Sequence, residues 1–191
     1  MIHEILLVLA LSLVVVFVRK QKLKNLIAVN IKGLAIFAAS FFLQFLAILI
    51  TTYFTDFFLS GYIHEYFSFI HCISYQLLLI GMVLNIEKHY MRILFLGTLL
   101  NFLVIMLNGM KMPVYIPMGY ENAIENIQYL QSGKDLIHTA MTEDTVLRIL
   151  GDIIVLSHPY PFPKTISIGD ILLIIGFGWF VQEETQDKEN R

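Results

Sequence analysis

The sequence predicts an all-α integral membrane protein: a helical bundle of about five transmembrane helices, with short amphipathic helices on the outer side. Two observations support this fold class. Of the 191 residues, 57% are hydrophobic and 15% are charged, with a mean hydropathy of +0.72, whereas soluble domains carry about 25% charged residues. The apolar residues also fall into five runs of spanning or near-spanning length. The whole chain, 1–191, is therefore expected to form a single membrane domain.

We expect the transmembrane helices at about residues 2–18, 34–54, 64–86, 93–107 and 166–181. The last of these is short for a hydrocarbon core of about 30 Å and requires local thinning of the bilayer. The first is not a cleaved signal peptide, because Arg19 and Lys20 follow it, whereas a signal peptide carries its basic residues in front.

The charged residues are sorted between the two sides of this topology. The inner segments contain nine Lys or Arg residues and five Asp or Glu residues, and the outer segments contain four and ten. The basic linker at residues 19–24 fixes the direction, because the positive-inside bias counts bases in short loops. We therefore expect a bacterial plasma-membrane protein with its N-terminus outside and its tail, 182–191, in the cytoplasm.

The longest polar segment, 108–165, is extracytoplasmic on this topology, and loops beyond about 15 residues usually hold structure or function. The apolar pattern predicts one amphipathic helix over 121–131, ended by Gly133. A second is predicted from Thr142, as N-cap, to Gly151.

Two features precede the last helix. Three prolines in residues 158–163 predict a stiff, extended stretch. Ser167 and Asp170 have the spacing of a capping pair at the start of a helix.

Several function classes lack support in the sequence. Cys72 is the single cysteine, so no disulfide or cysteine-based metal motif is possible within the chain. The nucleophile-elbow, P-loop and HExxH signatures are missing, so we predict no cofactor and favour a protein that is not an enzyme. The one basic cluster adjoins a membrane helix and indicates contact with anionic lipid, not nucleic acid.

Three short motifs carry a resemblance to a known family. They are NGMKMPV at 108–114, LGD at 150–152 and SIGD at 167–170. The chain resembles a family of small multi-pass bacterial membrane proteins, common in Firmicutes, that has no assigned function. Its first motif reads NGGRMPV, so this chain departs at Met110 and Lys111, keeping the charge but losing a glycine. The resemblance spans the chain and implies no activity, but it places the shared motifs on the outer face.

The outer motifs supply our main candidate site, formed by Asn108, Lys111, Asp152 and Asp170. The residue preferences of turns and helix caps explain part of this pattern. The alternative is a polar site in which the helix dipole and Lys111 neutralise Asp170.

Three amides, Gln44, Gln76 and Asn101, lie near the middles of the second, third and fourth helices. We interpret them mainly as contacts that join helices, because buried amides often hydrogen-bond across membrane helices. A polar cavity within the bundle is the alternative.

His64 and His71 lie seven residues apart, on roughly one face of the third helix, and are weak candidates for a metal site. Hydrogen bonding to a neighbouring helix is the plainer interpretation, and we predict no metal.

We expect a non-enzymatic accessory or binding protein that acts at the extracytoplasmic face. Its partners would be the lipid bilayer and a membrane protein or lipid-linked ligand. One alternative is an interfacial enzyme that uses Asp152, Asp170 and either His138 or His158 on a lipid-linked substrate. The other is a small-solute transporter that works through the amide layer.

Overall fold

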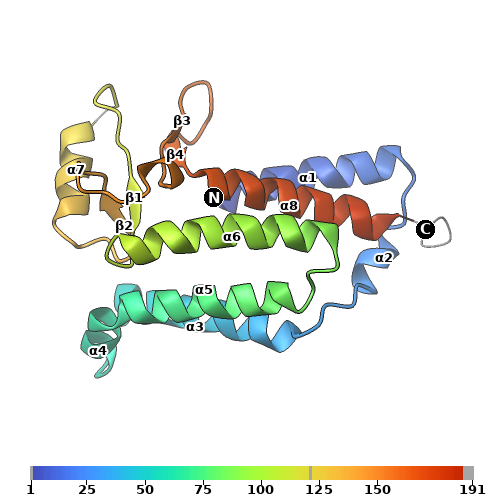
Figure 1. Ribbon diagram of the computed structural model, residues 1–191, viewed down its shortest axis with the longest axis horizontal. Helices are drawn as coiled ribbons and strands as arrows, with labels where there is room; N and C mark the ends of the chain where they lie inside the picture. The colour runs from blue at the N-terminus through green and yellow to red at the C-terminus, as the bar shows by residue number, and fades with distance from the viewer. Residues whose placement is uncertain (1, 121, 187–191) are drawn as a thin grey trace.

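The computed structural model describes residues 2–120 and 122–186, and the chain is mostly helical (Figure 1). Five long helices lie side by side and alternate in direction along the chain. They are α1 (Ile2–Val18), α3 (Leu34–Tyr53), α5 (Phe67–Val83), α6 (His89–Leu107) and α8 (Ile168–Thr185). By length and composition, α3 and α6 are able to cross a membrane, while α1 and α5 are apolar but shorter.

The helix bounds differ from expectation mainly at the ends. The helix expected over 64–86 is split at Tyr66 into α4 (Ser60–Glu65) and α5. Helix α6 starts four residues earlier than expected, at His89, and α8 continues to Thr185. A further short helix, α2 (Lys24–Ile27), lies in the basic linker. The part of the expected tail beyond residue 186 lies outside the described residues.

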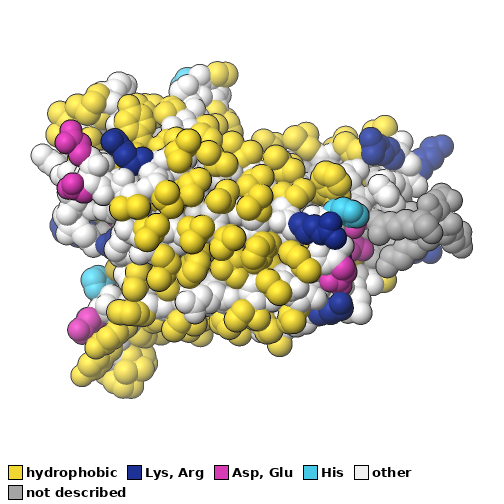
Figure 2. Space-filling view, viewed as in Figure 1, with side chains coloured by type: hydrophobic (Ala, Val, Ile, Leu, Met, Phe, Trp, Pro, Cys, Tyr) yellow, Lys and Arg dark blue, Asp and Glu magenta, His cyan; other side chains and the backbone are white. Residues whose placement is uncertain are grey.

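The bundle has two polar ends. At the loop end, defined by residues 54–66 and 108–167, lie α4, α7 and four short strands (Figure 1). At the turn end, defined by residues 19–33 and 84–88, lies α2. Figure 2 shows hydrophobic side chains over the middle of the visible face and charged side chains towards both ends. The segments expected on opposite sides of a membrane thus lie at opposite ends of the bundle.

The predicted helix after residue 120 is confirmed as α7 (Ala123–Gln131), and Gly133 follows it with a positive φ of 76°. Its expected first residue, Glu121, lies outside the described part of the chain.

The predicted helix from Thr142 to Gly151 is wrong, because only a 3₁₀ turn, η1 (Arg148–Leu150), forms there. Side chains take the backbone groups that a helix would use. The side chain of Asn108 bonds both the N–H and the carbonyl of Val146.

The four strands form two pairs that the sequence did not predict. β1 (Met112–Val114) pairs in parallel with β2 (His138–Ala140), and β3 (Ile154–Leu156) pairs antiparallel with β4 (Lys164–Ile166). The expected extended stretch 158–163 is instead the turn of the β3–β4 hairpin. Each strand has only three residues, too few for an alternating pattern.

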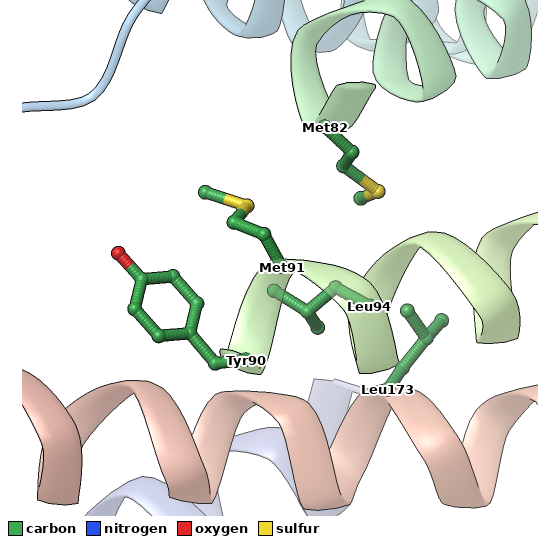
Figure 3. Close-up of a cluster of buried hydrophobic side chains, with 5 residues drawn as sticks. All are labelled: Met82, Tyr90, Met91, Leu94 and Leu173. Atoms are coloured by element: carbon green, nitrogen blue, oxygen red, sulfur yellow. The ribbon is translucent and has the colours of Figure 1, made fainter. Parts of the chain in front are cut away.

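The core between α5, α6 and α8 is an apolar cluster of Met82, Tyr90, Met91, Leu94 and Leu173 (Figure 3). All five side chains are buried because the helices approach closely.

Glycines permit the close contact between α6 and α8. A Cβ atom on Gly169 would lie 2.0 Å from Oδ1 of Asn101 and 2.7 Å from the carbonyl oxygen of Gly97. A Cβ on Gly176 would lie 2.6 Å from Cδ2 of Leu94. Small residues at such crossings let two helix backbones approach, and this crossing sets the position of Asp170.

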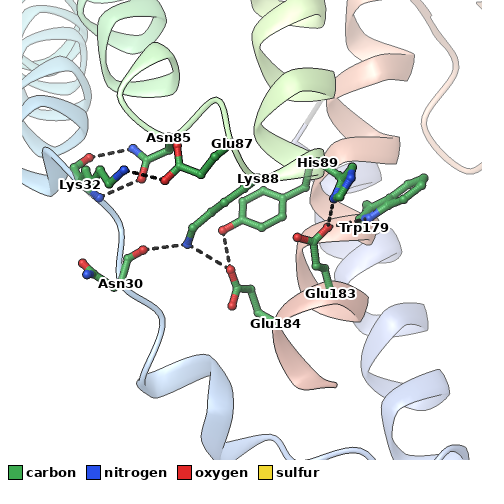
Figure 4. Close-up of polar contacts among 10 residues, drawn as sticks. Asn30, Lys32, Asn85, Glu87, Lys88, His89, Trp179, Glu183 and Glu184 are labelled. Carbon is green, nitrogen blue, oxygen red and sulfur yellow. Dashed lines mark hydrogen bonds and ion pairs between the residues drawn. The ribbon is translucent and has the colours of Figure 1, made fainter. Parts of the chain in front are cut away.

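Hydrogen bonds and ion pairs connect the segments at the turn end (Figure 4). Lys88 forms an ion pair of 3.1 Å with Glu184, which also accepts a 2.8 Å hydrogen bond from the Tyr90 hydroxyl. A second ion pair joins Lys32 to Glu87 at 2.8 Å, and it is exposed. These contacts hold the linker, α6 and α8 together at the end opposite the cavity described below.

Candidate functional site

The loop end contains a cavity of about 750 Å³ between the helical bundle and the segments that cover it. Its walls come from α5, α6, α7, the first turn of α8 and the strands β1, β2 and β4. Its polar lining includes Asn101, Asp135, His138, Asp152 and Asp170. Two of the four outer-motif candidates, Asp152 and Asp170, therefore share one cavity with Asn101 of the amide set.

The backbone of Asp152 is fixed against β1. Its N–H donates to the carbonyl of Pro113 at 2.9 Å, and its carbonyl accepts from the N–H of Tyr115 at 2.9 Å. The preceding residue is Gly151, where a Cβ atom would lie 2.8 Å from that same Pro113 oxygen. The motifs at 108–114 and 150–152 therefore meet in one backbone contact.

The side chain of Asp152 is only 7% exposed and lines the cavity. Its Oδ1 is buried and has no hydrogen-bond partner among the described residues. A buried oxygen without a partner loses hydration that nothing replaces, so it marks a position where a donor from a ligand would be stabilised.

Asp170 is held at the N-terminus of α8 by the predicted capping pair, which is confirmed. Its N–H donates to Oγ of Ser167 at 2.9 Å, and its Oδ2 accepts from the Ser167 N–H at 3.5 Å. Its Oδ1 accepts a 2.9 Å bond from Nδ2 of Asn101 on α6. Both carboxylate oxygens thus have neutral partners.

No Lys or Arg of the described chain forms an ion pair with either carboxylate, and the like charges of the two acids repel each other. Burial, and then the charge of Asp170, raises the pKa of Asp152 to about 7. The nearest lysine of the lining, Lys164, is bound at 2.6 Å to Glu4 of α1. Lys164 and His138 therefore act on Asp152 only through their charge, without forming an ion pair with it.

A second polar pair lies at the cavity wall. Nδ1 of His138 is 3.3 Å from Oδ1 of Asp135, which also accepts the backbone N–H groups of Ile137 and His138. Burial opposes charge on both groups, but their contact lowers the pKa of Asp135 to about 2 and raises the pKa of His138. Asp135 was not predicted, and its only signal is its position three residues before His138.

The other two outer-motif candidates have local partners instead. Asn108 bonds the carbonyl of Val104 and the backbone of Val146, so it ends α6 and holds the following loop. Lys111 donates to the carbonyls of Gly133 and Asp135, so it fixes the loop after α7. Neither side chain neutralises Asp170.

The three amides do not form one layer. Gln44 on α3 bonds Nδ1 of His71 on α5 at 3.1 Å, while Asn101 bonds Asp170 and Ser167. Gln76 is exposed. The amides that do join helices thus form separate contacts.

The histidine pair considered for metal is divided between two helices. His64 is exposed on α4, and His71 is buried on α5 beside Gln44. His158 is exposed in the β3–β4 turn. The described part of the chain contains no group of three or more His, Cys, Asp or Glu residues placed to hold a metal ion.

Comparison with known proteins gives one curated relative and one family. An uncharacterised protein of Thermotoga maritima is 29% identical over 160 residues, which cover 83% of this chain and 80% of the relative. No solved structure matches the chain. Residues 27–182 match a family of unknown function, and this range includes the three motifs and every wall of the cavity except His3 of α1. On the extent of that match, the chain belongs to the family of unknown function DUF5317.

Proposed function

We propose that this chain is a five-span bacterial membrane protein that binds a small polar ligand in the loop-end cavity. The ligand is a free solute or the head group of a lipid-linked molecule. The observation that carries the proposal is the carboxyl group of Asp152, a residue that lines the cavity and whose buried Oδ1 has no hydrogen-bond partner among the described residues.

The membrane part of the proposal is supported by the apolar surface of the helices. Only Ser40 and Ala47 of α3 are buried, and Phe41 and Phe42 are 64% and 58% exposed. Phe17 on α1 is 83% exposed. Soluble monomers rarely expose contiguous apolar patches of this kind, whereas helices in lipid do so along their length.

The alternating directions of the five helices support five spans. Such an arrangement puts the basic linker at one membrane face and the acidic loop end at the other (Figures 1 and 2). The positive-inside bias then favours the extracytoplasmic side for the cavity.

Two reporter fusions test the orientation. A reporter after Gln186 is expected to be active only in its cytoplasmic form, and one inserted after Asp144 only in its extracytoplasmic form. The reverse result at either site would contradict the proposed topology.

Thermal unfolding of the purified protein tests ligand binding. A panel of small amines, alcohols, carboxylates and sugars is added to the wild-type protein in detergent, and stabilisation by at least one class is expected. Asp152→Asn should reduce the shift, while Asp144→Asn, an exposed acid of the same loop end, should retain it. Equal shifts in all three proteins would place binding elsewhere.

An enzyme is the second candidate, favoured by the Asp135–His138 contact in the same cavity as Asp152. A carboxylate that orients a histidine, next to a carboxyl group of raised pKa, is a recurrent acid–base arrangement. Turnover of a stabilising ligand that is lost in His138→Asn would favour this candidate, and unchanged ligand after prolonged incubation would favour binding.

A further inference from the structure

We propose that the loop-end cavity recognises the primary ammonium group of a small organic cation, with the carboxylate of Asp152 as its acceptor. This inference rests on the proposed binding function and names the chemical class of the ligand.

The carboxylate oxygens of the cavity can accept further hydrogen bonds. Asp152 offers a buried oxygen without a partner, and each oxygen of Asp170 accepts a single bond from a neutral donor. Two donors of the lining are already used, since Asn101 donates to Asp170 and Lys164 donates to Glu4. A ligand that bonds the carboxylates must supply O–H or N–H donors, and an ammonium group supplies up to three N–H donors together with a positive charge.

The charges of the lining also favour a cationic ligand. Lys164 is paired with Glu4, and His138 contacts Asp135, so neither Asp152 nor Asp170 has an ion-pair partner among the described residues. His138 and Lys164 act on Asp152 only through their charge at longer range. A buried carboxylate gains most from a partner that brings both a positive charge and a hydrogen bond. An anionic ligand would instead add to the repulsion between the two acids.

The remaining lining suits an apolar or aromatic body on the ligand. Four tyrosines, Tyr75, Tyr115, Tyr120 and Tyr129, line the cavity. Aromatic rings attract ammonium groups and also bury apolar surface. Phenethylamine, which joins a primary ammonium to a phenyl ring, is therefore a suitable probe.

Calorimetric titration of the full chain in detergent at pH 8 tests the proposal with three probes. Phenethylamine has the charge and the donors, 2-phenylethanol has the same shape without the charge, and tetramethylammonium has the charge without donors. We expect saturable binding of phenethylamine, with the other two markedly weaker. Asp152→Asn should weaken phenethylamine binding by about 10- to 100-fold, the range for a charge-assisted hydrogen bond.

The outcomes separate this inference from the proposed function. Asp144→Asn is the matched control and should bind phenethylamine as the wild type does. If 2-phenylethanol binds as tightly as phenethylamine, or if another class of the wider panel binds and requires Asp152, the ammonium inference is wrong and a binding cavity remains. If no member of the panel binds, both proposals fail.

Discussion

Asn101 on α6 donates a 2.9 Å hydrogen bond from its side-chain amide to Oδ1 of Asp170 on α8. The amide oxygen of the same residue accepts a 2.9 Å bond from the Ser167 hydroxyl, which in turn caps α8. The side chain of Asn101, in the middle of the sequence, thus supports the cap at the N-terminus of α8. This contact lies at the wall of the cavity, so the stability of the α6–α8 crossing and the geometry of the candidate site are coupled.

Replacing Asn101 tests that contact. Asn101→Leu keeps the approximate volume but leaves the buried Asp170 carboxylate with one fewer donor, which should lower the free energy of unfolding by about 1–3 kcal/mol. Gln76→Leu, at an exposed amide of α5, is the control and should change it by less than about 0.5 kcal/mol. Denaturant unfolding of the purified variants measures both, and equal stabilities would show that the Asn101 contact contributes nothing.

Gly169→Ala should separate α6 from α8. The added methyl group would lie 2.0 Å from Oδ1 of Asn101 and 2.7 Å from the Gly97 backbone, and overpacking of this kind costs about 1–3 kcal/mol. The matched variant is Gly61→Ala in α4, where a Cβ atom meets nothing within 4 Å. Thermal unfolding should show a lower midpoint for the first variant alone. A normal midpoint for Gly169→Ala would mean that the two helices shift apart without loss.

The long helices followed from the sequence because apolar runs of this length have few other structures. The Ser167–Asp170 cap was also predictable, since both members lie within one helical turn and depend on no distant residue. The meeting of Asp152 with β1 was not, because it depends on backbone bonds between Pro113, Tyr115 and Asp152 that are specified by tertiary contacts.

The errors have the same physical origin. The helix expected from Thr142 fails because Asn108, at the end of α6, takes the backbone groups of Val146. The alternative in which Lys111 neutralises Asp170 also fails, because the Lys111 amine bonds two carbonyls of the loop after α7. In each case a polar side chain binds a backbone group far along the chain, and hydropathy and local spacing carry no signal for such a pair.

The two ion pairs of the turn end should differ in their contribution to stability. Lys88 and Glu184 are 18% and 8% exposed, whereas Lys32 and Glu87 are 61% and 52% exposed. Glu184→Ala leaves a largely buried Lys88 ammonium and removes the acceptor of the Tyr90 hydroxyl, so unfolding should become easier by about 3 kcal/mol or more. Glu87→Ala, the exposed counterpart, should unfold like the wild type. Comparable losses in both variants would contradict the assignment of the buried pair as the stabilising one.

The pKa of Asp152 predicts how stability depends on pH. Its folded-state pKa of about 7 lies above the ordinary value of 3.8, so between these values the folded chain binds more protons than the unfolded chain. The contribution of Asp152 to the free energy of unfolding should therefore fall as the pH rises from about 4 to 7, by about 1.4 kcal/mol per pH unit at most, and then level off. Among the described residues, the charged groups that act on Asp152 are Asp170, His138 and Lys164.

Comparison of the wild type with Asp152→Asn isolates this carboxyl group. His138 has a raised pKa and also loses its stabilising charge as the pH rises, but it is retained in both proteins. The difference in stability between the two proteins should thus move in favour of Asp152→Asn between pH 5 and pH 8, as the buried carboxyl group of the wild type ionises.

Phenethylamine, which binds the ionised form, should also bind the wild type more tightly at pH 8 than at pH 6. Thermal unfolding and calorimetry at these pH values check both expectations, and parallel pH profiles for the two proteins would show that Asp152 does not titrate in this range.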